Sequence, residues 1–402
     1  MSDQLISVTR PPSTRRLGWQ IGAATASRLL LNTGRRFPYP FAPALSRGLD
    51  VPLTAITSLI AINLATGLLS PLFGPLSDRW GYRVMMLLSL GMFALGMLAG
   101  GLLPFYLVIM AALFLAGLSK SIFDPALQAY LGKIVPYERR GLVIGLVEFG
   151  WSGSSLIGIP LIALLIERMG WQSPFLILGG LTLLAAVALG ILIPAEGRQP
   201  ITSTTTLNFR AVWREVRGNR AALGVLGFAF LIGLANDNLF VVYGAWLEGS
   251  FALSIVALGA TSSVIGIAEM IGEGLTASVA DRLGLKRSII AGLALSSLSY
   301  LLLPLFGHTL PLALAGLFVV FLSFEFAIVT TISLATEVLP AARATMMASM
   351  MATMSVGRVI GALAGGSIWL AGGLTAISLV STLATALSLG CLWWGLKHWR
   401  QG

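Results

Sequence analysis

The chain has 402 residues, of which 56% are hydrophobic and only 10% are charged. A soluble globular protein carries roughly 25% charged residues, so a chain this poor in charge is not expected to cover a surface that faces water. The single cysteine, Cys391, excludes an internal disulfide and a cysteine metal cluster, and the only histidines, His308 and His398, lie near the ends of apolar stretches. The composition predicts an integral membrane protein without a metal or cofactor site.

The apolar stretches predict twelve membrane-spanning helices. About 20 mostly apolar residues are needed to cross the hydrocarbon core. A span in lipid must satisfy its backbone polar groups internally, which favours helices over open strands. In chain order the predicted spans are 19–44, 54–76, 84–103, 106–132, 141–166, 172–194, 221–246, 256–278, 288–306, 309–334, 344–369 and 373–396.

The charged residues outside the spans predict the orientation. Lys and Arg are enriched in the cytoplasmic loops of membrane proteins. With both termini placed in the cytoplasm, only Arg47 and Arg168 among these Lys and Arg residues fall on the opposite side. We therefore expect a multi-pass protein of the plasma (inner) membrane with cytoplasmic termini. Its loops account for the net charge of +10, so no nucleic-acid partner is expected.

The longest connection between spans lies in the middle of the chain and divides six spans from six. Its basic stretch 209–217 is either an amphipathic helix on the inner leaflet or a solvated linker. The expected organisation is a cytoplasmic tail (1–18), a six-helix bundle (19–194), a cytoplasmic linker (195–220), a second six-helix bundle (221–396) and a short cytoplasmic tail (397–402).

A short charged motif occurs twice, once in each half of the chain. Asp78 and Asp281 each begin an Asp-Arg-x-Gly string that is followed by basic residues, and the second copy lies 203 positions after the first. The motif residues are Gly74, Asp78, Arg79, Gly81 and Arg83 in the first copy and Asp281, Arg282, Gly284 and Arg287 in the second. Glycine permits a tight turn between antiparallel helices at Gly81 and Gly284.

These strings resemble the Gly-x-x-x-Asp-Arg-x-Gly-Arg-Arg/Lys signature of the major facilitator superfamily. The second copy has Ala277 where the signature has glycine, and Tyr82 and Leu285 replace a basic residue. The resemblance covers the whole chain. It implies an all-α integral membrane fold of 12 transmembrane helices in two pseudo-symmetric six-helix bundles.

The resemblance also implies a conformational latch. In the family, the aspartate of the first copy accepts hydrogen bonds at the N-terminus of span 11, and by symmetry the second copy docks on span 5. Arg343 and Arg140 stand at those two helix starts. An acidic group at a helix N-terminus is worth on the order of 1–2 kcal/mol when it is partly buried. Span 5 also contains Gly153, Gly158 and Pro160, in a string that loosely resembles a motif of drug–proton antiporters.

Ionisable residues lie inside the predicted spans, where each needs a partner or a wet cavity. Because spans 1, 4, 7 and 10 line the central cavity in the family, the candidate residues for the substrate cavity and coupling are Arg35, Arg36, Lys120, Asp124, Asp237 and Glu325. Further candidates for proton or ion-pair sites are Glu148, Glu269, Glu273 and Arg358.

Two interpretations of these charges stay open. In one, Arg35, Arg36 and Lys120 hold an anionic or zwitterionic solute, and Glu325 or Asp237 carries a proton, because burial favours the neutral form of a carboxyl group. In the other, the charges form permanent structural pairs. The expected pairs are Arg28 with Glu148, Lys120 with Asp124, and Arg358 with Glu269.

Taken together, the sequence predicts a secondary transporter that works by alternating access. We expect an antiporter that couples the export of a small amphipathic organic solute to protons. The alternatives are an importer or exchanger of an organic anion or zwitterion, and a non-coupled sensor or lipid-handling protein of the same fold. No metalloprotease or ATP-binding motif occurs, so no catalytic residue is expected. We expect a monomer whose partners are a small-molecule substrate and the lipid bilayer.

Overall fold

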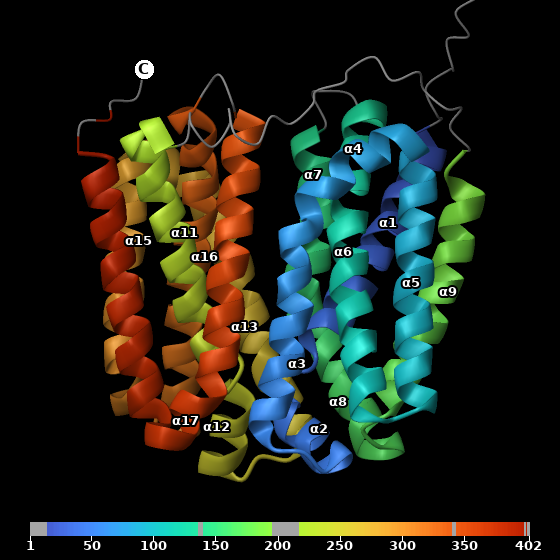
Figure 1. Ribbon diagram of the computed structural model, residues 1–402, viewed down its shortest axis with the longest axis horizontal. Coiled ribbons are helices and arrows are strands. Elements are labelled where there is room, and N and C mark those ends of the chain that lie inside the picture. The colour runs from blue at the N-terminus through green and yellow to red at the C-terminus, as the bar shows by residue number, and fades with distance from the viewer. Residues whose placement is uncertain (1–13, 136–139, 195–216, 340–342, 398, 400–402) are drawn as a thin grey trace, which may run out of the picture.

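The computed structural model describes residues 14–135, 140–194, 217–339, 343–397 and 399, and these residues form helices and no strands. Figure 1 shows two groups of helices side by side with their long axes roughly parallel. The N-terminal group comprises the described helices from α1 to α9, and the C-terminal group those from α11 to α17. Of the predicted linker (195–220), residues 195–216 lie outside the described residues. Of the two predicted tails, only residues 14–18, 397 and 399 are described.

The N-terminal group contains α1 (Thr14–Arg36), α2 (Ala42–Leu49), α3 (Leu53–Ala65), η1 (Thr66–Leu69), α4 (Ser70–Trp80), α5 (Tyr82–Leu102), α6 (Tyr106–Ile134), α7 (Arg140–Gly153), η3 (Ser154–Gly158), α8 (Ile159–Met169) and α9 (Ser173–Leu192). The C-terminal group contains α11 (Arg220–Phe240), α12 (Tyr243–Phe251), α13 (Ile255–Leu275), η4 (Thr276–Ala280), α14 (Asp281–Leu283), α15 (Leu285–Phe306), α16 (Leu310–Val338) and α17 (Arg343–Gly395).

Ten helical segments of the described chain are long and apolar enough to cross a membrane. The last of them holds two spans, because α17 leaves the helical region at Gly372 (φ −153°) and Gly373 (φ 58°). The helix α1 is not among the ten, because its five arginines lower its hydropathy. With α1 included and α17 divided, the helices follow the twelve predicted spans.

Several predicted spans are not single α-helices. The first was expected to run over 19–44, but α1 ends at Arg36, because prolines at 38 and 40 lack the N–H that a continuing helix needs. The seventh, expected over 221–246, is interrupted after Phe240, where Val241 and Val242 separate α11 from α12. A π-helical turn, η3, interrupts the fifth. These breaks bring the last turns of α1 and α11 to the interior, where helical interruptions often mark functional positions.

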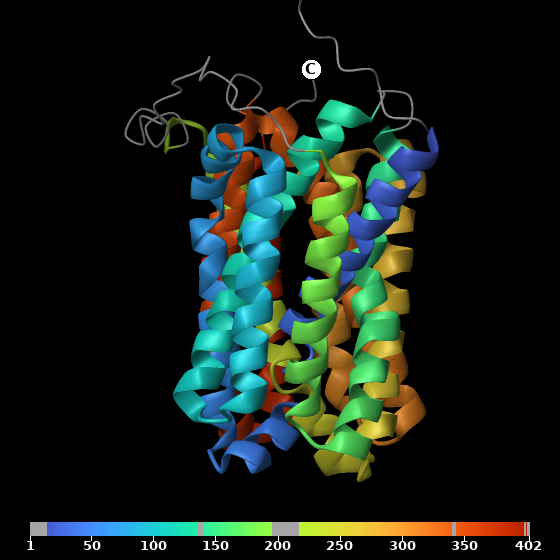
Figure 2. The ribbon, with the colours of Figure 1, turned by 90° about the vertical axis from the view of Figure 1, so that its right-hand side faces the viewer.

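The short helices α2 and α12 lie together at the lower end of the molecule in Figure 1, which we call the α2–α12 end. The two Asp-Arg-x-Gly turns lie at the opposite end, which we call the turn end. Figure 2 shows α1 crossing the N-terminal group at a slant from the turn end toward the interior. Its last turn is therefore placed between the two groups.

The two turns have the same backbone conformation. Gly81 has φ 89° and ψ 142°, and Gly284, 203 positions later, has φ 83° and ψ 139°. Both φ values lie in the left-handed region, which glycine adopts without steric cost. The repeat seen in the sequence is therefore a repeat in three dimensions.

The two groups pack through α8 against α13, α3 against α17, and α2 against α12. The approach of α13 is close at Gly266, where an added Cβ atom would lie 2.8 Å from the backbone nitrogen of Leu156 and 3.0 Å from the carbonyl oxygen of Ser152. A larger residue at this position would separate the groups.

We predict that Gly266→Val lowers the free energy of unfolding by about 1–3 kcal/mol, the usual cost of an overpacked contact. The measurement is denaturant titration of the purified protein in detergent. Gly274→Val is the matched control, because Gly274 lies in the same helix, is exposed and has open space where a Cβ would be. Equal destabilisation by both variants would contradict a specific contact between α13 and the N-terminal group.

Candidate functional site

The ionisable side chains inside the spans form three networks and leave three groups without a charged partner in the part of the chain that the structure describes. We call these the N-terminal network, the central pair and the tyrosine network. Two of them join the N-terminal group to the C-terminal group. Their residues come from α1, α6, α7, α11, α13 and α17.

The N-terminal network lies within one group. Arg28 of α1 contacts Glu148 at 2.8 Å and Asp124 at 3.3 Å, and Lys120 contacts Asp124 at 2.6 Å. Lys120 and Asp124 are one helical turn apart on α6, the spacing at which side chains meet. The structure thus forms both pairs that the sequence suggested here. With two cations and two carboxylates, the network is electrically balanced.

The central pair joins the two groups. The Arg36 guanidinium donates two hydrogen bonds to the Glu269 carboxylate, at 2.6 and 3.1 Å. Both side chains are buried, with 4% of each exposed. The Arg36 guanidinium also lies 4.3 Å from the ring centroid of Trp151, a cation–π distance. A bidentate geometry and an aromatic face stabilise two charges that are otherwise costly to bury.

The tyrosine network also crosses between the groups. Arg358 of α17 donates to the Asp237 carboxylate at 2.6 and 3.3 Å, and the Tyr39 hydroxyl donates to the same carboxylate at 3.0 Å. Tyr39 stacks on Phe240 with ring centroids 4.3 Å apart. The sequence-based pairing of Arg358 with Glu269 is wrong, because Glu269 faces Arg36 across the interface and Arg358 faces α11.

Arg35, Glu273 and Glu325 have no charged partner among the described residues. The Nε of Arg35 donates to the side-chain oxygen of Asn63 at 2.9 Å. Glu325 is 8% exposed and lies against α13, where an added Cβ at Gly272 would be 2.9 Å from the Glu325 Cβ. Glu273 of α13 is half-buried. The three groups leave positive charge beside α3 and negative charge beside α13.

A cavity of about 410 Å³ opens between α6 and α7. Its walls are mostly apolar, from Leu131, Val135, Val143 and Val147, and Glu148 of the N-terminal network is its acidic lining residue. An apolar wall with a few polar groups is typical of a site for an organic ligand.

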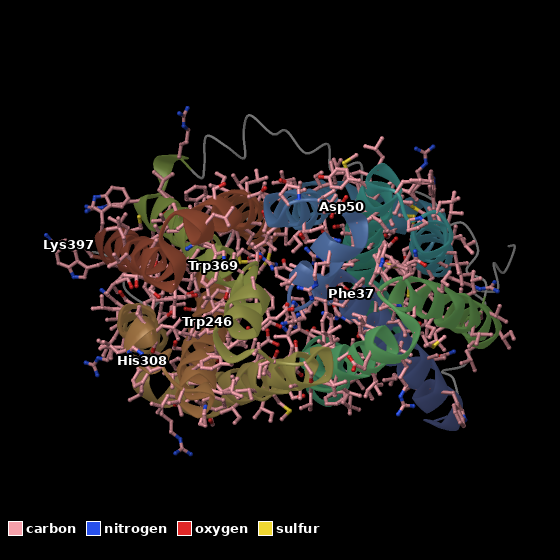
Figure 3. The ribbon with its side chains drawn as sticks, turned by 90° about the horizontal axis from the view of Figure 1, so that it is seen from below. Phe37, Asp50, Trp246, His308, Trp369 and Lys397 are labelled. Atoms are coloured by element: carbon pink, nitrogen blue, oxygen red, sulfur yellow. The ribbon has the colours of Figure 1, made fainter. Side chains whose placement is uncertain are left out.

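Figure 3 views the molecule from the α2–α12 end. It shows Phe37, which directly follows the two arginines at the end of α1, toward the middle of the molecule, and Lys397 at the outer edge.

Three residues of the site are absent from the sequence-based candidates. Asn63 holds Arg35, Trp151 covers Arg36, and Tyr39 donates to Asp237. A buried asparagine inside an otherwise apolar span is the signal that would have identified Asn63, because a polar side chain in lipid must find a partner. Nothing in the sequence distinguishes Trp151 from a tryptophan that faces lipid.

The predicted latch contacts cannot be followed in the described side chains. The residues concerned, Gly74, Asp78, Arg140, Asp281 and Arg343, lie outside them. Of the other motif residues, Arg79, Arg282 and Arg287 are exposed. Arg83 donates to the carbonyl of Gly190 at 2.5 Å, and Lys286, 203 positions later, donates to the carbonyl of Leu396 at 2.9 Å. Each basic residue thus binds the C-terminus of the last helix in its own half, where the helix dipole favours a cation.

Comparison with known families identifies the fold. The Major Facilitator Superfamily model matches residues 25–235 and 225–399. The chain belongs to the Major Facilitator Superfamily. It is a multi-pass membrane protein and a transporter of small molecules, not an enzyme.

Bacterial transporters are among the relatives of this superfamily member. An uncharacterized MFS-type transporter, YceJ, of Bacillus subtilis (strain 168) is 26% identical over 302 residues, which cover 75% of this chain and 76% of the relative. The multidrug resistance protein MdtG of Citrobacter koseri is 27% identical over 314 residues, with 73% and 74% covered. A crystal structure of a bacterial homolog to the human lysosomal transporter Spinster superposes with a TM-score of 0.73 at 14% identity and covers 95% of both chains.

We predict that Arg36→Met destabilises the protein by about 3–5 kcal/mol, because it leaves Glu269 buried without its partner. The double variant Arg36→Met/Glu269→Met should recover most of this loss, since it removes both charges. The measurement is the free energy of unfolding in detergent.

Arg47 supplies the control for this prediction. It also reaches across the groups, to Glu248 at 2.8 Å, but 60% of its side chain is exposed. Arg47→Met should therefore cost less than about 1 kcal/mol. A double variant that is no more stable than Arg36→Met would show that the cost does not come from an uncompensated charge.

Proposed function

We propose that this transporter exports a small amphipathic organic solute and is driven by protons through alternating access. We place it in the plasma (inner) membrane as a monomer, with the turn end and both termini in the cytoplasm. The relatives named as multidrug resistance proteins support an efflux role. The observation that carries the proton coupling is Glu325, a buried carboxyl group without a charged partner in the described chain.

The contacts between the groups support alternating access. The central pair, the tyrosine network and Arg47–Glu248 all join the N-terminal group to the C-terminal group. We place all three between the middle of the spans and the α2–α12 end, where they hold the two groups together. Opening that end requires these contacts to separate, while the cavity between α6 and α7 gives access to the N-terminal network in the present state. A transporter of this fold exposes a midplane site to one side at a time by rocking its two halves.

Glu325 is suited to carry a proton. It lies on α16 against α13, the helix that also carries Glu269 and Glu273. Glu269 is bound by Arg36, whereas Glu325 forms no ion pair in the described residues. An unpaired carboxyl in such a place is held more readily in the neutral form than in the charged form. Binding and release of a proton at Glu325 would change the net charge beside the central pair. Because the central pair joins the two groups, this change would couple the proton to their separation.

We predict that Glu325→Gln abolishes uphill transport and keeps downhill exchange, because glutamine retains the size of the side chain and cannot release a proton. The measurement uses proteoliposomes with a proton gradient and three naphthalene probes of different charge: 2-naphthalenesulfonate, 2-naphthalenemethanol and (2-naphthylmethyl)trimethylammonium. Gradient-driven movement of any charged probe by the unmodified protein, and its loss in the variant, is the expected result.

Glu337→Gln is the matched control, because Glu337 lies on the same helix three turns away, near the turn end. It should transport like the unmodified protein. Full gradient-driven transport by Glu325→Gln would exclude Glu325 as the proton site. Failure of the unmodified protein to move any probe against its gradient would contradict proton-coupled export itself.

A second candidate is the import or exchange of an organic anion or zwitterion. The unpaired guanidinium of Arg35 favours it. The direction in which the gradient drives the probes in the same proteoliposomes distinguishes import from export.

A further inference from the structure

Arg35 is the one arginine of the central spans whose charge no carboxylate neutralises in the described part of the chain. Its guanidinium has five N–H donors. One of them, at Nε, binds the Asn63 side chain, and no described residue accepts from its two terminal nitrogens. The residue as a whole is half-buried.

The carboxylates whose charge acts on Arg35 are already bound to other cations. Asp237 is held by Arg358, and Asp124 is shared by Lys120 and Arg28. Arg358 also lies near enough to repel Arg35. The region beside α1, α3 and α11 therefore carries a net positive charge.

The guanidinium is held in place by a chain of hydrogen bonds. The amide nitrogen of Asn63 donates to the carbonyl of Leu113 on α6 at 2.7 Å, and this contact is buried. It directs the amide oxygen of Asn63 toward Arg35, which donates to it at 2.9 Å. Two helices thus fix the orientation of a guanidinium that has free donors. A fixed, planar set of donors suits a carboxylate, sulfonate or phosphate group, which arginine binds in bidentate fashion.

A set of aromatic rings begins at Tyr39, four residues after Arg35 in the chain. Tyr39 stacks on Phe240 with ring centroids 4.3 Å apart. Phe240 in turn contacts Tyr243 at 5.3 Å and Phe321 at 5.2 Å. A ligand whose anionic group meets Arg35 could place an aromatic body against these rings, which favour offset or edge contacts.

We propose that Arg35 is the anion-binding subsite of the transport site and that the transported solutes are small aromatic organic anions. Arg36 and Lys120 take no part in holding the anion, because Glu269 and Asp124 neutralise them. Asn63 is a positioning residue that acts through Arg35. This inference rests on the proposed transport function, and it commits that function to one class of solute.

The test measures binding without any gradient, by equilibrium dialysis of the purified full chain in lipid nanodiscs against the same three naphthalene probes. We expect 2-naphthalenesulfonate to bind more tightly than the neutral alcohol and the trimethylammonium cation. Arg35→Gln should weaken sulfonate binding at least about tenfold, the loss expected for a charge-assisted hydrogen bond. It should change binding of the neutral alcohol by less than about twofold, since no charge contact is lost. Arg35→Lys should retain an intermediate preference for the anion.

Three comparisons keep the test specific. Arg168→Gln, at the exposed end of α8, removes one positive charge away from the site and should bind all probes like the unmodified protein. Asn63→Leu should reduce the preference for the sulfonate while keeping the Arg35 charge. An unchanged unfolding temperature confirms that each variant is folded.

The proposal is overturned if the unmodified protein shows no preference for the sulfonate, or if Arg35→Gln weakens all three probes equally, as a structural role would. Absence of saturable sulfonate binding below about 1 mM overturns it as well. These outcomes are separate from a failure of proton-coupled transport, which the proteoliposome experiment detects and which leaves binding at Arg35 intact.

Discussion

The buried ion pair between Arg36 and Glu269 is the contact on which the arrangement of the two halves depends. Each of these charges alone would be costly inside a membrane protein. Their bidentate hydrogen bonds and the adjacent Trp151 ring make burial tolerable only while the two halves lie together. Separation of the halves at this level removes the partner of each charge, so another source of neutralisation must be present during the transition.

The same constraint explains which charges are structural and which are available. Arg28, Lys120, Asp124 and Glu148 neutralise one another within one half, so they can move with it as a unit. Arg358, Asp237 and Tyr39 form a second contact across the interface. Arg35, Glu273 and Glu325 are the buried or half-buried groups that have no charged partner in the described chain. An unpaired charge in a transport pathway can bind a solute or a proton.

The two halves are similar in backbone and different in polarity. Gly81 and Gly284 adopt the same turn, and Arg83 and Lys286 bind equivalent helix ends. At the centre the symmetry ends, because α1 ends in Arg35 and Arg36, whereas the last turn of α11 carries Asp237 and no basic residue. A shared skeleton with opposite charge at the interface allows the halves to attract each other and to bind an asymmetric solute between them.

The sequence by itself determined the membrane class, the positions of the spans and the doubled turn. These depend on local properties: the length of an apolar stretch, the conformational freedom of glycine, and the spacing of residues within one helix, which also predicted the Lys120–Asp124 pair. It did not locate the breaks in the first and seventh spans to the residue. It also placed Arg358 with Glu269, a pairing that does not occur.

Only the tertiary structure decided the partners across the two halves. Arg36, Glu269, Asp237 and Arg358 lie on four helices from different parts of the chain. Which carboxylate each arginine meets depends on the rotation and depth of helices that are far apart in sequence, and no periodicity within one helix encodes this. The free guanidinium of Arg35 follows from the same cause, since it is left over only after the other pairs have formed.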